Sequence, residues 1–335
     1  MVDQSIVGQH LESVGRATAT ANFALSKYWG KQTGGVQQPA VPSISVGIQG
    51  LTAEAEVRLN YGTNQEHEIR IAGNPANEKT CRRIETLLDA VFAHSGRKAQ
   101  AIIRSDTRFP IAAGLASSAA GMAAVAGAAW IAAGLDPGDR SAIADCARLG
   151  SGSACRSVHD GYVAWEPTDD GSIIRQVASA DHWPLELCLV RLDDRPKKVS
   201  SADGMLHCME TSPVWSSWVE RAFLDAVEIE QAILDKDLEK LADLVEANCL
   251  LMHATTLTAR PPIFYMQGRT LQVMETVTSL RRDGLPCFFT VDAGPNVKVF
   301  TAPGTAQTIK TALEDMAPID VYAIGGGLTA EESSI

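Results

Sequence analysis

A stretch of small and hydroxyl-bearing residues, PIAAGLASSAAGMAA at 110–124, is well suited to binding a phosphate group. Gly114 and the small side chains around Leu115, such as that of Ala116, let a ligand approach the backbone closely. Ser117 and Ser118 then precede an alanine-rich run, which predicts that a helix begins there. The unpaired N–H groups and the dipole of a helix N-terminus favour negative charge, so the stretch predicts a phosphate cradle. The alternative is a capped core helix, and the spacing fits neither a Walker A loop nor a dinucleotide fingerprint.

A second segment, GSGSACRS at 150–157, combines hydroxyl groups with one cation. The hydroxyls of Ser151 and Ser153 and the nearby backbone N–H groups can donate hydrogen bonds to an anion. The fork-shaped guanidinium of Arg156 matches the geometry of a carboxylate or a phosphate. The segment therefore predicts an anion site, and a Ser/Gly turn with a surface arginine is the alternative.

A third segment, SKYWGK at 26–31, carries two lysines around aromatic residues. Lys27 and Lys31 flank Tyr28 and a tryptophan, which brings charge, hydrogen bonding and flat apolar surface to one spot. The segment is a candidate binding element. A solvated turn with an aromatic anchor is the alternative interpretation.

The carboxylate of Asp292 stands between two apolar stretches and begins the sequence DAGPN. Burying a carboxylate is unfavourable unless it is paired or functional. Asp292 is therefore a candidate general base, or an electrostatic group beside a reacting hydroxyl. The alternative is an aspartate that caps a tight turn. Three histidines lack any nucleophile context and predict no catalytic triad: His159, His207 and His253.

Alternating strands and helices position these segments in the first half of the chain. A polar lead-in is expected over residues 1–15. Strand patterns cover 14–25, 43–50, 51–62, 67–73 and 99–105. The second and third of these predict an antiparallel hairpin. Helix patterns cover 77–95, the alanine-rich run and 136–148, and the segment around Arg156 leads into another strand.

The second half of the chain is mainly helical. A buried type of strand is expected over 185–192, and a helical stretch opens at 199–209. Helix-period apolar stripes then cover 215–232, 238–252 and 264–283. Strands at 287–290 and 297–300 bracket Asp292, and a helix at 305–315 and a last strand at 321–324 follow. Because neither a repeat nor a low-complexity linker separates the halves, we expect them to share an interface.

Composition limits the classes of function. The chain has 335 residues, 45% of them hydrophobic and 21% charged, which suits a globular protein of one large or two closely packed domains. The net charge of −11 argues against nucleic-acid binding. The seven cysteines are scattered singly, so neither a zinc site nor a disulfide framework is expected, and a reducing cytoplasm fits best. The first residues lack a signal-peptide pattern, and we expect no membrane association.

Four separated segments, at 22–31, 110–121, 150–157 and 291–296, together resemble the mevalonate diphosphate decarboxylase family of the GHMP kinase superfamily. The resemblance extends over roughly residues 16–328. It implies an α+β, two-lobed GHMP-kinase-type fold with the active site in the cleft. The N-terminal ATP-binding domain, like domain 2 of ribosomal protein S5, would cover 1–184, and a ferredoxin-like C-terminal domain 185–335. It also implies a homodimer.

The resemblance implies an ATP-dependent decarboxylation of (R)-5-diphosphomevalonate to isopentenyl diphosphate in the mevalonate pathway of isoprenoid biosynthesis, after phosphorylation of the 3-hydroxyl. ATP and Mg²⁺ would be the cofactors. Nucleotide phosphates would be held by Gly114, Leu115, Ala116, Ser117 and Ser118, with Ser118 as the metal contact. Asp292 would face the 3-hydroxyl as base or orienter, Lys27 would keep it ionised, and Arg156 would fix the substrate carboxylate. The terminal phosphates would be gripped by Tyr28, Lys31, Ser151 and Ser153.

Two departures from the family pattern leave alternatives open. Val41, Pro42 and Ser43 replace the usual Asn-Ser-Ser type of sequence, and Ala202 replaces an arginine or threonine. Both changes are expected to remove polar groups near the substrate end, so a 5-phosphate substrate is an alternative to the 5-diphosphate. A GHMP small-molecule kinase without decarboxylation is the second alternative. A non-catalytic metabolite-binding protein on the same scaffold is the third.

Overall fold

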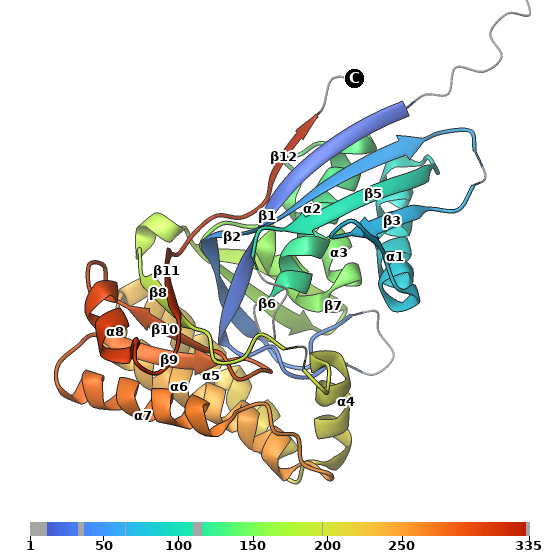
Figure 1. The fold of residues 1–335 in the computed structure, drawn as a ribbon. Helices are drawn as coiled ribbons and strands as arrows, with labels where there is room; N and C mark the ends of the chain where they lie inside the picture. Colours follow the sequence, from blue (N-terminus) through green and yellow to red (C-terminus); the bar gives the residue numbers. More distant parts are fainter. Residues whose placement is uncertain (1–11, 33–36, 64, 110–115, 196, 333–335) are drawn as a thin grey trace, which may run out of the picture.

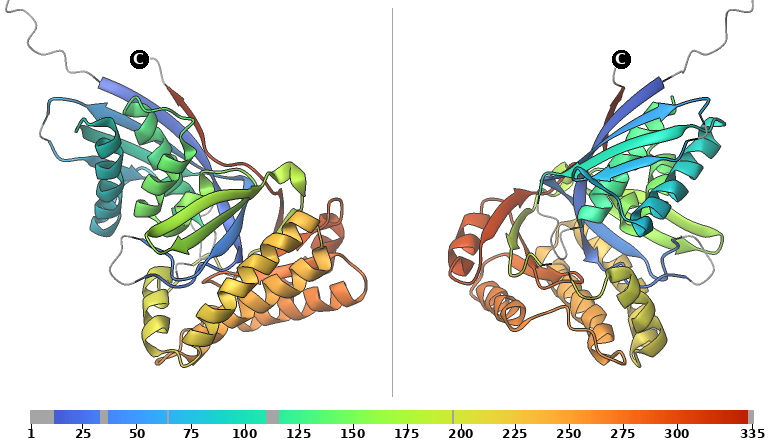
Figure 2. Two further views of the ribbon diagram at one scale, coloured as in Figure 1. Left: turned by 180° about the vertical axis from the view of Figure 1, so that it is seen from behind. Right: turned by 45° about the vertical axis from the view of Figure 1, so that its right-hand side comes forward.

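The structure, a computed structural model, describes residues 12–32, 37–63, 65–109, 116–195 and 197–332 (Figure 1). Two predicted residues of the phosphate cradle, Gly114 and Leu115, lie outside these ranges. The described chain forms two β-sheets with helices packed on them, one unit above the other in Figures 1 and 2. The larger sheet has eight strands in the order β12-β1-β2-β5-β3-β4, and β6 and β7 branch from β2. The smaller sheet has the order β11-β8-β10-β9.

The first unit is built from the following elements. Its strands are β1 (Glu12–Ser26), β2 (Ser43–Asn60), β3 (Glu68–Ile71), β4 (Asn74–Pro75), β5 (Gln100–Thr107), β6 (Tyr162–Thr168) and β7 (Gly171–Ala178). Its helices are α1 (Glu78–Ser95), α2 (Ser117–Ala132), α3 (Arg140–Gly150) and the short 3-10 helices η1 (Gly152–Ser157) and η2 (Ala180–His182).

The second unit follows in the chain. It contains β8 (Glu186–Val190), α4 (Ser201–Thr211), α5 (Trp215–Asp235), α6 (Leu238–Thr258), α7 (Gly268–Arg282), β9 (Cys287–Val291), β10 (Val297–Thr301), α8 (Ala306–Leu313) and β11 (Ile319–Ala323). Strand β12 (Thr329–Glu332) then returns to the first unit and pairs with β1.

Helix α2 is the buried centre of the first unit, and its alanine-rich sequence explains how it packs. A Cβ atom at Gly15 of β1 would lie 2.2 Å from the carbonyl oxygen of Ala128. A Cβ atom at Gly127 would lie 3.2 Å from the Cβ of Ala17. Only small residues permit backbones to approach this closely. The helix is therefore pressed against β1, and its first turn is held in a fixed place relative to the end of that strand.

Three expectations about the strands were wrong. Residues 43–62 do not form a hairpin, because β2 is one strand that runs past Gly50 at a φ of 84°. Its first half pairs with β6 and its second half with β5, while β1 pairs along both. The lead-in ends earlier than expected, since β1 already begins at Glu12. The strand at 319–323 is not the last one, because β12 follows it, and β7 was not anticipated.

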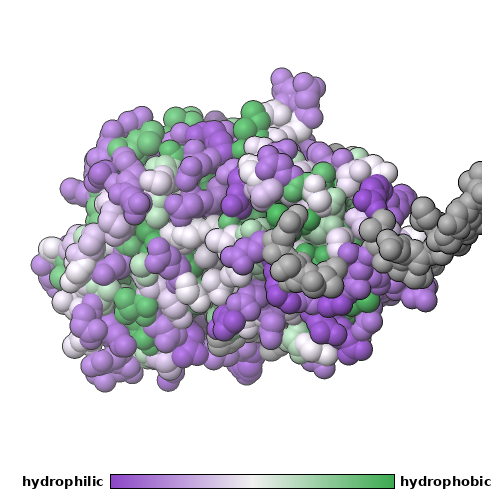
Figure 3. Space-filling view, turned by 90° about the horizontal axis from the view of Figure 1, so that it is seen from above, coloured by the Kyte–Doolittle hydropathy of each residue, from purple (hydrophilic) through white to green (hydrophobic). Residues whose placement is uncertain are grey.

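The two units share part of one core. A single buried cluster includes Phe23 of β1, Leu187 of β8, Ile229 of α5 and Phe288 of β9. Helices α6 and α7 cover the smaller sheet through residues such as Cys249. No described helix combines the length and the apolar character needed to cross a membrane. On the face seen from above, apolar side chains lie scattered among polar ones (Figure 3).

Candidate active site

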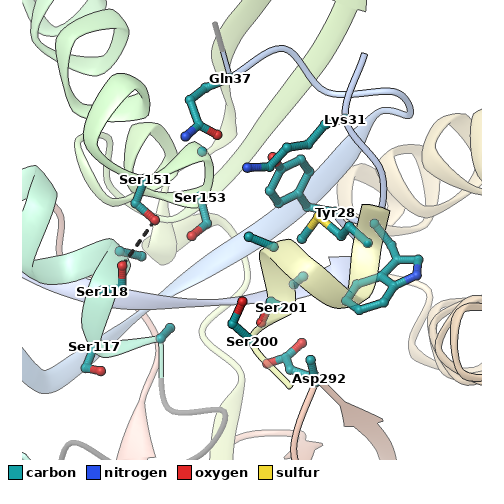
Figure 4. Close-up of a pocket in the computed structure, with 18 of the residues that line it drawn as sticks. Tyr28, Lys31, Gln37, Ser117, Ser118, Ser151, Ser153, Ser200, Ser201 and Asp292 are labelled. Atoms are coloured by element: carbon teal, nitrogen blue, oxygen red, sulfur yellow. Dashed lines mark hydrogen bonds between the residues drawn. The ribbon is translucent and has the colours of Figure 1, made fainter. Parts of the chain in front are cut away.

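A cavity of about 1100 Å³ opens between the two units and gathers the predicted site residues from distant parts of the chain. Its lining includes every described residue of the predicted set: Lys27, Tyr28, Lys31, Ala116, Ser117, Ser118, Ser151, Ser153, Arg156 and Asp292. Figure 4 labels seven of these side chains, which come from the start of α2, the segment after α3, the segment after β1 and the end of β9: Tyr28, Lys31, Ser117, Ser118, Ser151, Ser153 and Asp292. Residues that the sequence singled out in distant segments therefore share one cavity.

Two strand ends meet at one side of the cavity. Lys27 is the first residue after β1, and Asp292 is the first residue after β9. The Nζ atom of Lys27 lies 2.7 Å from Oδ1 of Asp292. A third residue, Lys298 of β10, places its Nζ atom 3.1 Å from Oδ2 of the same carboxylate. The side chains of Lys27 and Lys298 are 2% and 0% exposed, and that of Asp292 is 25% exposed.

The two ammonium groups determine the charge of Asp292. Burial alone would raise the pKa of Asp292, but the adjacent Lys27 and Lys298 outweigh burial and hold this pKa below its usual range. Burial lowers the pKa of Lys298, and the attraction of Asp292 opposes that change. Asp292 is therefore ionised at neutral pH.

Buried amides fix both strand ends. The side-chain oxygen of Asn248, on α6, accepts a hydrogen bond of 2.8 Å from the backbone N–H of Lys27. Its amide nitrogen donates to Oδ2 of Asp225 at 2.9 Å. In the turn that follows Asp292, the side-chain oxygen of Asn296 accepts from the backbone N–H of Leu192 at 2.7 Å. These bonds hold the turns rigidly, because a buried amide that loses its partners is unfavourable.

Arg156 is a buried cation on η1. Its side chain is 2% exposed, one of its NH groups donates to the hydroxyl of Ser43, and its Nε atom has no partner. It makes no ion pair with any described acidic residue. Burial lowers the pKa of Arg156. A buried guanidinium without a counter-ion is unfavourable, so the position is explained by an anion that enters the cavity.

Helix α2 begins at Ser117, as the sequence predicts, but it has no side-chain cap. The residue before its first turn is Ala116, in a left-handed conformation with φ of 53°, and no side chain caps the helix. Ser117 and Ser118 are its first two residues rather than its caps, so their hydroxyls are free to face the cavity. The Ser118 hydroxyl donates to that of Ser151 at 3.3 Å (Figure 4). It also accepts a hydrogen bond of 3.3 Å from Arg83 of α1.

Tyr28 and Lys31 extend the wall from the end of β1. The ring of Tyr28 packs against Trp165 at 4.8 Å, and its buried hydroxyl has no partner. Burial raises the pKa of Tyr28, so this hydroxyl stays protonated and is available as a donor. Burial and the nearby cations Arg83 and Lys79 lower the pKa of Lys31. Both side chains suit the recognition of an anion.

The charge around the cavity is opposite to that of the whole chain. Seven cationic side chains and two carboxylates line it, although the protein carries a net charge of −11. The cations come from four segments: Lys27 and Lys31; Lys79, Arg82 and Arg83; Arg156; and Lys197. Concentrated positive charge in a concave site attracts polyanions such as nucleotides and diphosphates.

The departures from the family pattern fall in different places. Val41 is fully buried in a cluster with Trp29 and Trp218, and neither Val41 nor Pro42 is among the described residues that line the cavity. The expectation that both changes affect the substrate end therefore does not hold for these two. Ala202, at the start of α4, does line the cavity. Ser43 holds Arg156.

Several residues of the site were missed. Lys298 was not singled out because a lysine within an apolar strand is typical of a solvent-facing position, whereas every residue of β10 is buried. Arg83 lies on a helix whose other charges are exposed. Asn22 of β1 donates to the carbonyl of Ser153 at 3.1 Å, and this buried amide had no sequence signal of its own. Lys197 stands in the charged stretch DDRPKK at 193–198, a composition typical of solvent-exposed chain.

The fold and the site define an α+β enzyme of two units that binds anions in the cleft between them. Residues 19–174 match the N-terminal domain family of diphosphomevalonate decarboxylase-like proteins, and residues 187–324 match the C-terminal domain family of mevalonate 5-diphosphate decarboxylase. The chain belongs to the diphosphomevalonate decarboxylase family. This confirms the resemblance, the predicted two-domain α+β fold and the predicted class of enzyme.

Relatives of known identity support this assignment. Diphosphomevalonate decarboxylase of Candida albicans is 32% identical over 306 residues, which span 84% of this chain and 83% of that protein. The human enzyme is 30% identical over 88% of this chain and 78% of its own length. The structure is similar to that of the Staphylococcus aureus mevalonate diphosphate decarboxylase, with a TM-score of 0.88, 34% identity, and coverage of 96% and 99% of the two chains. A bacterial relative solved with MVAPP, AMPPCP and magnesium has a TM-score of 0.87 at 35% identity, covering 96% of this chain and 100% of its own.

Proposed function

We propose that this cavity carries out the ATP-dependent decarboxylation of (R)-mevalonate 5-diphosphate to isopentenyl diphosphate, and that the predicted residues perform it. The observation that carries the proposal is the buried guanidinium of Arg156, which lacks an acidic partner among the described residues and lies in the same cavity as the cluster around Asp292. A site that combines an unpaired guanidinium with a fixed carboxylate fits a substrate bearing both a carboxylate and a hydroxyl.

The first step is phosphoryl transfer. The oxygen of the substrate's 3-hydroxyl forms a bond to the γ-phosphorus of ATP, while the bond from that phosphorus to the bridging oxygen breaks and ADP leaves with its electron pair. Asp292 accepts a hydrogen bond from the hydroxyl and orients it. Because its pKa is held low, Asp292 is a weak base, and the proton passes to an oxygen of the transferred phosphoryl group. Lys27 offsets the negative charge that develops there.

The second step is elimination. The C3–O bond breaks and the phosphate leaves with its electron pair. The electrons of the C1–C2 bond form the new C2–C3 double bond, and carbon dioxide departs. Arg156 holds the carboxylate so that the breaking C1–C2 bond can align with the departing phosphate. The products are isopentenyl diphosphate, ADP, phosphate and carbon dioxide.

The nucleotide binds at the start of α2. The first N–H groups of this helix point at the nucleotide phosphates, with Ser117 and Ser118 beside them. Gly114 and Leu115 are proposed as part of the same cradle. The neutral hydroxyl of Ser118, which lines the cavity, would be a protein ligand of Mg²⁺ beside oxygens of the nucleotide phosphates. Mg²⁺ neutralises charge on the phosphates when bound.

The substrate diphosphate binds beside the nucleotide phosphates, since Ser151 of its proposed set contacts Ser118 at 3.3 Å. Tyr28, Lys31, Ser151 and Ser153 donate to its oxygens. Val41 is buried and is not among the described residues that line the cavity, which favours the diphosphate over the 5-phosphate because it removes one of the reasons for expecting a smaller anion. The fixed pair of Lys27 and Asp292 favours a complete enzyme over a non-catalytic binding protein.

The proposal also covers the domain boundary, the oligomeric state and the location in the cell. A boundary between residues 184 and 185 is supported by the change from the larger sheet to the smaller one between β7 and β8. A homodimer is supported by exposed apolar side chains on α5, such as Phe223 and Val227. A cytoplasmic location is supported by the seven cysteines, which are all free thiols.

Arg156→Met tests the role given to the guanidinium. Loss of one charged hydrogen-bonding partner, at about 1.5–3 kcal/mol, lowers kcat/KM for isopentenyl diphosphate formation about 10- to 100-fold, with ATP affinity unchanged. Arg175→Met is the matched control, because its guanidinium pairs with Glu166 and Glu230 outside the cavity. An Arg156 variant that matches the control in rate contradicts the role. A wild-type protein that forms ADP without isopentenyl diphosphate contradicts the proposed function itself.

A further inference from the structure

The carboxylate of Asp292 has more positive charge around it than neutrality requires. Lys27 contacts one of its oxygens at 2.7 Å, and Lys298 contacts the other at 3.1 Å. One ammonium group would balance the carboxylate, and burying a second one is unfavourable. An arrangement that is unfavourable for folding and borders a reaction site calls for a functional explanation.

The two lysines differ in their access to the cavity. Lys27 lines the cavity together with Asp292, whereas Lys298 is not among its lining residues in the described part of the chain. The side chain of Lys298 is 0% exposed. Apart from Asp292, its ammonium group has two neighbours, the carbonyl of Asn296 at 3.4 Å and the ring of Phe23 at 4.9 Å. Lys298 therefore approaches the carboxylate from behind, where substrate does not reach.

The two lysines also differ in how they are held. Lys298 extends from β10, a strand paired on both sides by β8 and β9. Lys27 stands in the segment that follows β1, and its ammonium group has one other partner, the carbonyl of Ala24 at 3.1 Å. An ammonium at the end of a flexible side chain can turn toward an incoming anion. If it does so, Asp292 keeps a counter-ion only through Lys298.

We propose that Lys298 is a positioning residue for the reaction: it is the permanent counter-ion of Asp292 and frees Lys27 to engage the transferred phosphoryl group. This inference rests on the proposed function. Lys298 acts through Asp292 and touches no substrate. It fixes the carboxylate by occupying Oδ2 and keeps the group ionised throughout the reaction.

Other charged groups near Asp292 do not take this role. The ammonium group of Lys197 donates to Ser201 and to the carbonyl of Ala293 rather than to the carboxylate. The titratable or charged groups that face the carboxylate from the surrounding elements are Lys27, Lys298, Lys197, Arg156, His253 and Cys249. Among these, hydrogen bonds to the carboxylate come from Lys27 and Lys298.

The test compares Lys298→Met and Lys298→Gln with the wild type, using ATP, Mg²⁺ and mevalonate 5-diphosphate. In both variants we expect kcat to fall 10- to 100-fold and KM for either substrate to change less than threefold, because the residue does not touch substrate. The acid limb of kcat/KM should appear at higher pH than in the wild type, by at least one pH unit. Lys240→Met is the control, since it removes the same charge from an exposed position on α6.

A variant that loses thermal stability but keeps the wild-type kcat and pH profile assigns Lys298 a structural role only and overturns the proposal.

A second measurement needs no substitution: a crystal structure of the wild type with mevalonate 5-diphosphate and AMPPCP. The Lys298 ammonium should remain within hydrogen-bond distance of Asp292 while that of Lys27 moves to the γ-phosphate. The opposite movement overturns the proposal. An inactive wild-type protein would instead contradict the proposed function.

Discussion

Asp292→Asn is the substitution that most directly perturbs the centre of the site. The wild-type carboxylate accepts hydrogen bonds from Lys27 at 2.7 Å and from Lys298 at 3.1 Å. An amide keeps one oxygen acceptor but replaces the other oxygen with an NH₂ donor, which faces an ammonium group. One buried cation therefore loses its partner. The substitution keeps the size of the side chain, so its effects come from charge and hydrogen bonding.

Both stability and rate should change by predictable amounts. Breaking one partner from a buried ion pair typically costs about 3–5 kcal/mol. Because the Asp292 side chain is 25% exposed, we expect the lower end, about 3 kcal/mol of the free energy of unfolding. The 3-hydroxyl loses its charged acceptor and Lys27 its fixed position, so kcat should fall by about 10²–10³-fold. The affinity for ATP should change less than about threefold, because the start of α2 is untouched.

The assay measures ADP formation at saturating substrate, ATP binding by calorimetry and unfolding by urea. Glu246→Gln is the matched control. Glu246 is a buried carboxylate that pairs with Arg281 at 2.5 Å and accepts from the N–H of Phe289 at 3.1 Å, away from the cavity. It should lose a similar amount of stability and keep its kcat. Our reasoning is refuted if Asp292→Asn retains kcat within tenfold of the wild type, or if both variants lose activity equally.

Three further predictions concern the surroundings of the site. In Gly152→Ala the new Cβ would lie 2.6 Å from the Tyr28 hydroxyl. This overpacking should lower the free energy of unfolding by about 1–3 kcal/mol and raise KM for the substrate. Gly268→Ala is the control, because the space around Gly268 is open. Asn248→Leu leaves a buried N–H and a carboxylate without their shared partner, which lowers the free energy of unfolding by about 2–5 kcal/mol and also lowers kcat. Burial lowers the pKa of His253 from 6.5 to about 4. The neutral form therefore stabilises the fold fully above pH 6.5, and this contribution is lost as the pH falls toward 4. The loss should reach about 3 kcal/mol of the free energy of unfolding.

Each of these predictions has a measurement that can contradict it. For Gly152→Ala, an unchanged KM would mean that the tyrosine hydroxyl does not contact substrate. For Asn248→Leu, a full kcat despite lower stability would mean that this amide does not position the lysine. For the histidine, urea unfolding at pH 7.5 and pH 5 compares the wild type with His253→Leu. An equal loss of stability in both proteins would contradict the linkage.

The sequence predicted the elements that depend on local pattern. The helix over residues 77–95 was found from its apolar spacing, and Asn77 does cap it by accepting from the N–H of Thr80. The hairpin at 43–62 was wrong because two glycines are typical of turns, whereas here they let one long strand bend between two partners. Strand β12 was missed because four residues are too few to show a hydrophobic periodicity. They form a strand because they pair with β1.

In the functional site, too, some features could be predicted from the sequence and others arise only from tertiary contacts. The partnership of Lys27 and Asp292, 265 positions apart, came from the family resemblance, since no local pattern links two such distant residues. The sequence around Arg156 fits a surface turn equally well, because the burial of this side chain depends on packing against distant strands such as β1 and β2. Lys298 could not be recognised because its environment is created by strands on both sides of β10. Tertiary contacts therefore decided which charges are buried.

The measurement that tests the central claim most directly follows carbon dioxide release from substrate labelled at C1, together with ADP formation, in the presence of ATP and Mg²⁺. Mevalonate 5-diphosphate and mevalonate 5-phosphate are compared side by side. We predict one carbon dioxide per ADP and a strong preference for the diphosphate. A preference for the monophosphate would contradict the proposed substrate. ADP formation without carbon dioxide would contradict decarboxylation and make the protein a kinase of the same superfamily.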